Sequence, residues 1–84
     1  MYEEISKVSE KTLNIKRAID SLREEVEAID FYNQRMDATN DEELKKILHH
    51  NAKEEKEHAA MLIEWLRKND SEFEDELKDY LFKS

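Results

Sequence analysis

The chain has 84 residues, a formal net charge of −8, and no cysteine, glycine or proline. This length allows a single domain, residues 1–84, with little core of its own, and the missing cysteines exclude disulfides and thiolate chemistry. The acidity argues against nucleic acid as a partner, and without glycine or proline an all-α fold is nearly the only fold class left.

The N-terminal sequence MYEEISKVSE lacks the basic and then apolar pattern of a signal peptide. Elsewhere the apolar residues never run for the roughly 18 positions that a membrane span requires. We therefore expect a cytoplasmic protein without a membrane partner.

The first predicted helix covers residues 3–37, because one stripe of residues recurs every three or four positions with no helix breaker between them. The stripe consists of Ile5, Val8, Thr12, Ile15, Ile19, Leu22, Val26, Ile29 and Met36. Such a helix is about 50 Å long, which exceeds the core of any monomer of this size. Part of the stripe is therefore expected to contact another subunit.

Two further helices are predicted, over residues 41–68 and 71–82. Thr39-x-x-Glu42 and Ser71-x-x-Glu74 match capping boxes, which would begin the second and third helices. Residues 69–71 form the break between these two helices. Two long antiparallel helices with a short connection form a hairpin, which is half of a ferritin-like four-helix bundle. A dimer of such hairpins would complete the bundle.

Glu55-x-x-His58 lies within the apolar arc of the second helix, and Glu25 lies within that of the first. A carboxylate in apolar surroundings needs a partner, and a cation is one. Ferritin-like di-iron bundles use one Glu from each of two helices and Glu-x-x-His from each of the other two. This chain supplies half of that set, and a twofold dimer would supply the rest.

Two other interpretations use the same residues. Glu55 and His58 could be a satisfied polar pair that fixes the register of a non-redox helical dimerisation module. Alternatively, the ligands could hold Zn or Mn without redox chemistry. Glu24 and Glu27 project away from the stripe and are a solvated face by default.

The chain closely resembles the encapsulated ferritins, the iron-oxidising cargo of encapsulin nanocompartments, in three segments: DFYNQRMD (30–37), HNAKEEKEHAAM (50–61) and EWLR (64–67). The resemblance covers residues 22–82, and EEKEHAA is its specific block. It implies a ferroxidase that oxidises Fe(II) to Fe(III) at a dinuclear centre with two iron ions per subunit dimer. The oxidised iron would be stored as mineral inside the encapsulin shell.

The resemblance also implies roles for individual residues. Glu25, Glu55 and His58 of both subunits would be the catalytic metal ligands, with Tyr32 beside them. Glu24 and Glu27 match the acidic pair of a secondary metal site that guides iron inward.

At the level of assembly, the resemblance implies a ring-shaped decamer, a pentamer of dimers, with the encapsulin shell protein as partner. The family's C-terminal targeting peptide has no counterpart in the last residues of this sequence. The alternatives are a trimmed chain and a chain fused directly to its shell subunit.

Overall fold

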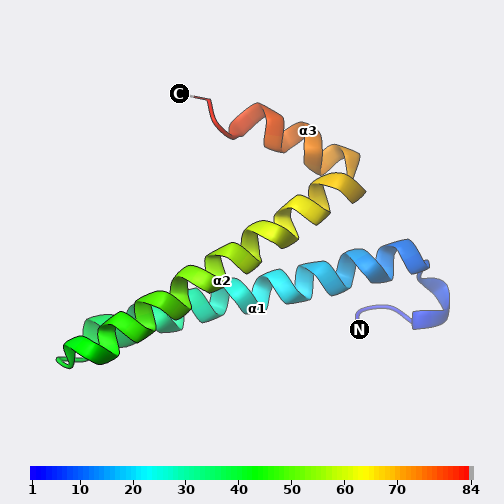
Figure 1. Cartoon of the computed structure of the whole chain (residues 1–84). Helices are drawn as coiled ribbons and strands as arrows, with labels where there is room; N and C mark the ends of the chain where they lie inside the picture. Colours follow the sequence, from blue (N-terminus) through cyan, green and yellow to red (C-terminus); the bar gives the residue numbers. More distant parts are fainter. Residues whose placement is uncertain (84) are drawn as a thin grey trace.

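The computed structural model describes residues 1–83; Ser84, the last residue of the expected domain, lies outside the described part. A short 3₁₀ turn, η1 (Ile5–Lys7), precedes three α-helices: α1 (Glu10–Ala38), α2 (Glu42–Asn69) and α3 (Ser71–Tyr80). α1 and α2 run antiparallel, and α3 projects from the far end of α2 (Figure 1). The described residues contain no strand, which confirms the all-helical fold class.

The first helix begins at Glu10 rather than near Glu3 as predicted. Ser9 ends the preceding segment in an extended conformation, and its Oγ accepts a hydrogen bond from the Thr12 backbone N–H at 3.1 Å. A serine cap satisfies one of the free N–H groups at a helix start. The apolar periodicity continues upstream through Ile5 and Val8, which is why the pattern alone placed the start too early.

The connection between α1 and α2 differs from the predicted capping box. Asp41, not Thr39, caps α2, because its Oδ1 accepts from the Leu44 backbone N–H at 2.9 Å. Thr39 instead ends α1, and its Oγ1 accepts from the Asp41 N–H at 3.1 Å. Thr39 thus ends α1 and Asp41 precedes α2 as its cap. As a result, α2 runs over Glu42–Asn69 instead of 41–68.

The third helix is also shifted from its expected position. Asp70 caps it by accepting from the Phe73 N–H at 3.0 Å, and the helix ends at Tyr80 rather than Phe82. Phe82 has a positive φ of 62°, which is incompatible with helix continuation. Arg67 of α2 donates to Glu74 of α3 at 3.3 Å, so an ion pair spans the joint between the two helices.

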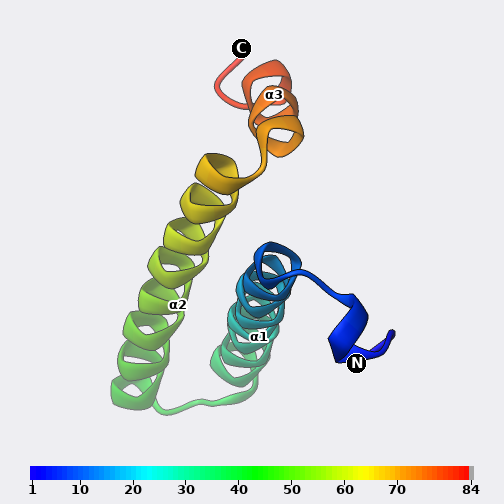
Figure 2. The same ribbon diagram turned by 90° about the vertical axis from the view of Figure 1, so that its right-hand side faces the viewer.

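The helices α1 and α2 lie side by side in a single layer. The molecule as a whole measures 50 × 38 × 15 Å. Figure 2 shows this arrangement from a second direction, with α3 beyond the end of α2 and apart from α1. Among the described residues the buried apolar side chains are few and mostly small: Ala18, Ala52, Ala59 and Leu66. Alanines allow the two helix backbones to approach closely. Among the described residues, no helix is long and apolar enough to cross a membrane.

Candidate metal centre

Glu25, Glu55 and His58 come together across the hairpin, as the sequence predicts. Glu55 and His58 are three residues apart, so they lie one turn apart on the same face of α2. Glu25 lies near the middle of α1 and reaches the same place from the antiparallel helix. One donor atom from each residue lies within 4.8 Å of the other two.

The imidazole lies between the two carboxylates. His58 Nδ1 is 3.4 Å from Glu25 Oε2 and 3.6 Å from Glu55 Oε2. Both distances exceed the usual range of about 2.7–3.2 Å for a hydrogen bond. The three side chains are therefore close together without hydrogen bonds between the imidazole and the carboxylates. The two glutamate side chains are each 24% exposed and His58 is 47% exposed.

Glu25 provides a test of whether a metal fits. Its Oε2 is buried and makes no hydrogen bond within the described part of the chain. An acceptor without a donor is costly to bury, and a second carboxylate nearby adds repulsion. A metal ion bonded at about 2.1 Å holds its donors within about 4.2 Å of one another, close to the separation found here. The donor set therefore fits a metal cation of the kind that carboxylates and imidazoles bind.

Tyr32 lies on α1, half-buried and two turns beyond Glu25. The Arg35 guanidinium lies over its ring, 5.6 Å from the ring centroid, and 5.9 Å from that of Phe31. Sequence reasoning missed this role of Arg35, although its spacing of three and four residues from two aromatic rings is a signal for such stacking. The cation orients the Tyr32 ring from the side of α1.

Glu24 and Glu27 are exposed on α1 and do not join the three-residue cluster. His50 also lies apart from it: its Nε2 is 2.8 Å from Glu54 Oε1, four residues further along α2. Glu54 and Glu55 are adjacent in sequence, yet Glu54 makes an exposed contact with His50 whereas Glu55 belongs to the half-buried cluster. These two residues form a natural matched pair for experiments.

Comparison with known proteins gives consistent matches over nearly the whole chain. A family model described as EncFtn-like matches residues 1–84. An encapsulated ferritin-like protein of Rhodospirillum rubrum is 53% identical over 81 residues, which are 96% of this chain and 58% of that protein. A ferritin-like protein of Thermotoga maritima is 48% identical over 81 residues, 96% of this chain and 71% of that protein.

The structural comparison agrees. A crystal structure of a protein from Nitrosomonas europaea matches with a TM-score of 0.95 and 57% identity, covering 100% of this chain and 92% of that one. The chain thus matches the solved structure almost end to end, whereas it spans little more than half of the Rhodospirillum relative.

Proposed function

The chain belongs to the EncFtn-like family, and we propose that it is a ferroxidase that oxidises Fe(II) to Fe(III) at a dinuclear centre formed between two copies. Membership of this family implies a ferritin-like function related to iron. Iron is the substrate of the proposed reaction. Each Fe(II) loses one electron to dioxygen or peroxide, and the carboxylates stabilise the more highly charged product.

The observation that carries this proposal is the cluster of Glu25, Glu55 and His58 with its unpaired buried oxygen. A structural polar pair would close its hydrogen bonds, because a partly satisfied buried group is costly. Here the Nδ1–Oε2 distances of 3.4 and 3.6 Å leave the imidazole between two acceptors, closely bonded to neither. A metal cation satisfies all three groups together.

A second copy is needed because one chain supplies two carboxylates and one imidazole, too few for two metal ions. His58 remains half-exposed, and apolar side chains around it on α2 are also exposed. Met61 is 63% exposed, Ile47 52% and Trp65 36%. A twofold partner covering this side would bring its own Glu25, Glu55 and His58 to the same place. The centre would then have four carboxylates and two imidazoles.

In this proposal the dimers assemble further, into a ring-shaped decamer, and act inside an encapsulin shell that stores the oxidised iron as mineral. The name of the Rhodospirillum relative supports a location inside a shell. Glu24 and Glu27, exposed on α1, would form the secondary site that collects Fe(II), and Tyr32 would assist electron transfer at the centre.

The test is aerobic oxidation of Fe(II), followed by the absorbance of Fe(III). His58→Ala should reduce the rate to that of buffer, because it removes one metal ligand from each half of the centre. His50→Ala is the matched control, since this imidazole lies on the same helix but pairs with Glu54 outside the cluster. It should oxidise iron at the wild-type rate.

Three outcomes would contradict the proposal. Wild-type oxidation no faster than buffer would exclude a ferroxidase. Equal rates of Fe(II) oxidation by the His58→Ala and His50→Ala variants would show that the reaction takes place at another site on the chain. Tight binding of Zn(II) or Mn(II) at the cluster without iron oxidation would favour a non-redox metal protein, and a metal-free dimer would favour a purely structural module.

A further inference from the structure

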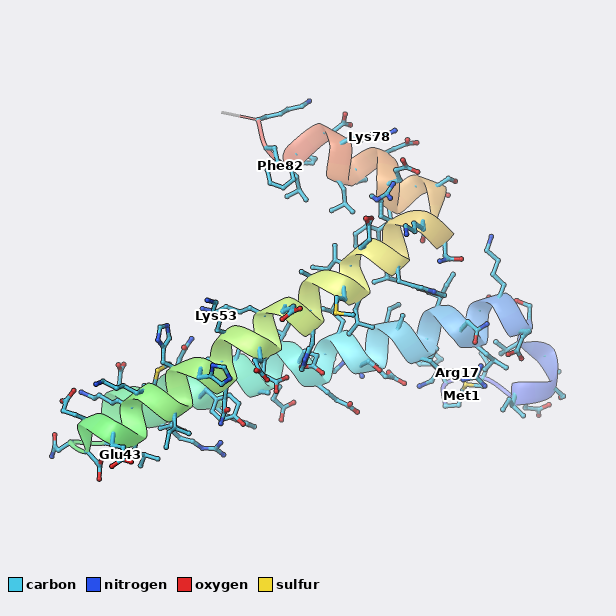
Figure 3. The ribbon with its side chains drawn as sticks, in the orientation of Figure 1. Met1, Arg17, Glu43, Lys53, Lys78 and Phe82 are labelled. Atoms are coloured by element: carbon cyan, nitrogen blue, oxygen red, sulfur yellow. The ribbon has the colours of Figure 1, made fainter. Side chains whose placement is uncertain are left out.

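The sulfur of this chain lies in three methionines, Met1, Met36 and Met61, because cysteine is absent. Met1 lines a cavity beside the first half of α1, and Met36 lines a hollow beside the first turns of α2. Figure 3 shows Met1 and Glu43, a residue of those first turns, at opposite ends of the hairpin. Met36 also follows Glu25 by eleven residues on α1, about 16 Å along the helix axis. Both methionines therefore lie outside the turns that carry the metal-ligand cluster.

Met61, in contrast, is a direct neighbour of a predicted ligand. It follows His58 by three residues on α2, and residues at this spacing have Cβ atoms roughly 5–6 Å apart. Long side chains of a helix also lean towards its N-terminus, onto the residues three or four positions earlier. The thioether of Met61 therefore leans towards the turn that carries His58. It is also open to reaction, since Met61 is 63% exposed.

The proposed reaction supplies an oxidant at this place. When dioxygen accepts one electron from each of two Fe(II) ions, together with two protons, the product is hydrogen peroxide. A thioether consumes hydrogen peroxide: its sulfur lone pair forms a bond to one oxygen, the O–O bond breaks, and water leaves. The sulfur is oxidised by two electrons, the peroxide is reduced by two, and methionine sulfoxide remains.

Peroxide formed at the cluster would meet Met61 before it reaches bulk solvent. His58, Met61 and Trp65 follow one another at spacings of three and four residues, so they share one side of α2. In the proposed dimer a second copy covers this side, which restricts the escape of small molecules. A reactant held beside its target reacts as if it were highly concentrated. Met61 is therefore better placed than Met1 or Met36 to react with peroxide from the centre.

We propose that Met61 is an oxidation site that consumes hydrogen peroxide released at the centre and thereby protects the ligand His58. This inference rests on the proposed ferroxidase function, which supplies the peroxide. The step needs no metal bond to sulfur, because the thioether reacts with free peroxide. Methionine sulfoxide reductases reverse the product, so the same side chain can act again after repair.

The test is peptide mass spectrometry of the full chain after repeated aerobic additions of Fe(II), with Fe(III) formation recorded in the same samples. Met61 should gain one oxygen atom, whereas Met1 and Met36 should remain largely unmodified. Catalase in the solution should not protect Met61, because it removes peroxide only from bulk solvent. Hydrogen peroxide added without iron is the matched control. It should modify Met1, which is 59% exposed, at least as readily as Met61.

The outcomes separate this inference from the function on which it rests. Iron oxidation that leaves Met61 unmodified, or that modifies the three methionines equally, would overturn the oxidation site while the ferroxidase stands. Full protection of Met61 by catalase would do the same, since the peroxide would then come from bulk solvent. Absence of iron oxidation would overturn both.

Met61→Leu tests the protective role, because leucine has a similar volume and keeps this side of α2 apolar. The first addition of Fe(II) should be oxidised at the wild-type rate, since Met61 is not a ligand. Over repeated additions the variant should lose rate faster than the wild type, and His58 should gain an oxygen atom. Met36→Leu is the matched control and should retain its rate as the wild type does. Equal losses in the two variants, with His58 unmodified in both, would contradict protection by Met61.

Discussion

At the residue scale, the cluster is defined by which of two neighbouring glutamates faces inward. Glu55 is 24% exposed and lies near His58, whereas the side chain of Glu54 is 53% exposed and pairs with His50. Contacts between exposed side chains such as the latter contribute little to stability. Two residues of the same type at successive positions therefore have different chemical surroundings, because a helix turns about 100° per residue.

We expect Glu55→Gln to abolish stabilisation by metal and Glu54→Gln to preserve it. A ligand that binds only the folded state at about 100 times its Kd stabilises that state by about 2.7 kcal/mol. Thermal unfolding under anaerobic conditions, with Fe(II) and with chelator, measures this difference. A metal-dependent rise in Tm that is equal in both variants would show that Glu55 is not a ligand.

At the element scale, the joint between α2 and α3 depends on a few polar contacts. Arg67 hydrogen-bonds to Glu64 on α2, which lowers the pKa of that carboxyl, and it also donates to Glu74 of α3. Because the folded-state pKa of Glu64 is lowered, its contribution to stability is complete above the ordinary glutamate pKa. That contribution is lost as the pH falls through the lowered value. Acid below the ordinary glutamate pKa should therefore break the Glu64–Arg67 contact on α2 before it affects the alanine contacts of the hairpin.

Asp70→Ala should release α3 while α1 and α2 stay folded. Loss of an aspartate cap costs about 1 kcal/mol, which is large for a helix of ten residues. Hydrogen exchange should speed up at α3 amides and remain unchanged in α1. Asp75→Ala serves as control, since Asp75 lies inside α3 and does not cap it. Equal exchange in the two variants would mean that packing on α2, rather than the cap, holds α3.

At the scale of the whole molecule, the chain is much more extended than a self-sufficient domain. Its radius of gyration is 16.6 Å, whereas a compact chain of this length has about 12 Å. Its smallest extent is 15 Å, the thickness of little more than one layer of helices. Stable domains pack at least two layers around one core. We therefore expect another copy or a partner to complete the core of this hairpin.

We expect assembly to depend on metal, because the proposed dimer would bring four carboxylates together and a cation would relieve their repulsion. Light scattering in chelator should give a smaller mass than in Fe(II) under anaerobic conditions. In the Glu55→Gln variant, which removes one negative charge per chain, the mass should depend less on metal. An identical wild-type mass with and without Fe(II) would contradict this dependence.

Local spacing is sufficient to predict much of this protein. The recurrence of apolar residues every three or four positions predicted the long helices, and the three-residue spacing of Glu55 and His58 placed them on one face. The predicted helix boundaries were less accurate, because several polar side chains near each helix start could act as its cap. Ser9, Asp41 and Asp70 begin the three helices, and the competition is decided by which side chain reaches a free N–H group.

Only the tertiary structure decided what lies opposite each face. The turn at Thr39–Asp41 sets the register of α1 against α2, and this register brings Glu25 within 3.4 Å of His58 and leaves one oxygen without a hydrogen bond. Likewise, α3 points away from α1 because of contacts at Asp70 and Arg67, not because of its own helical pattern. Sequence alone determined which residues share a helix face, since helix geometry is local. Which faces meet depends on packing between distant segments, and that required the fold.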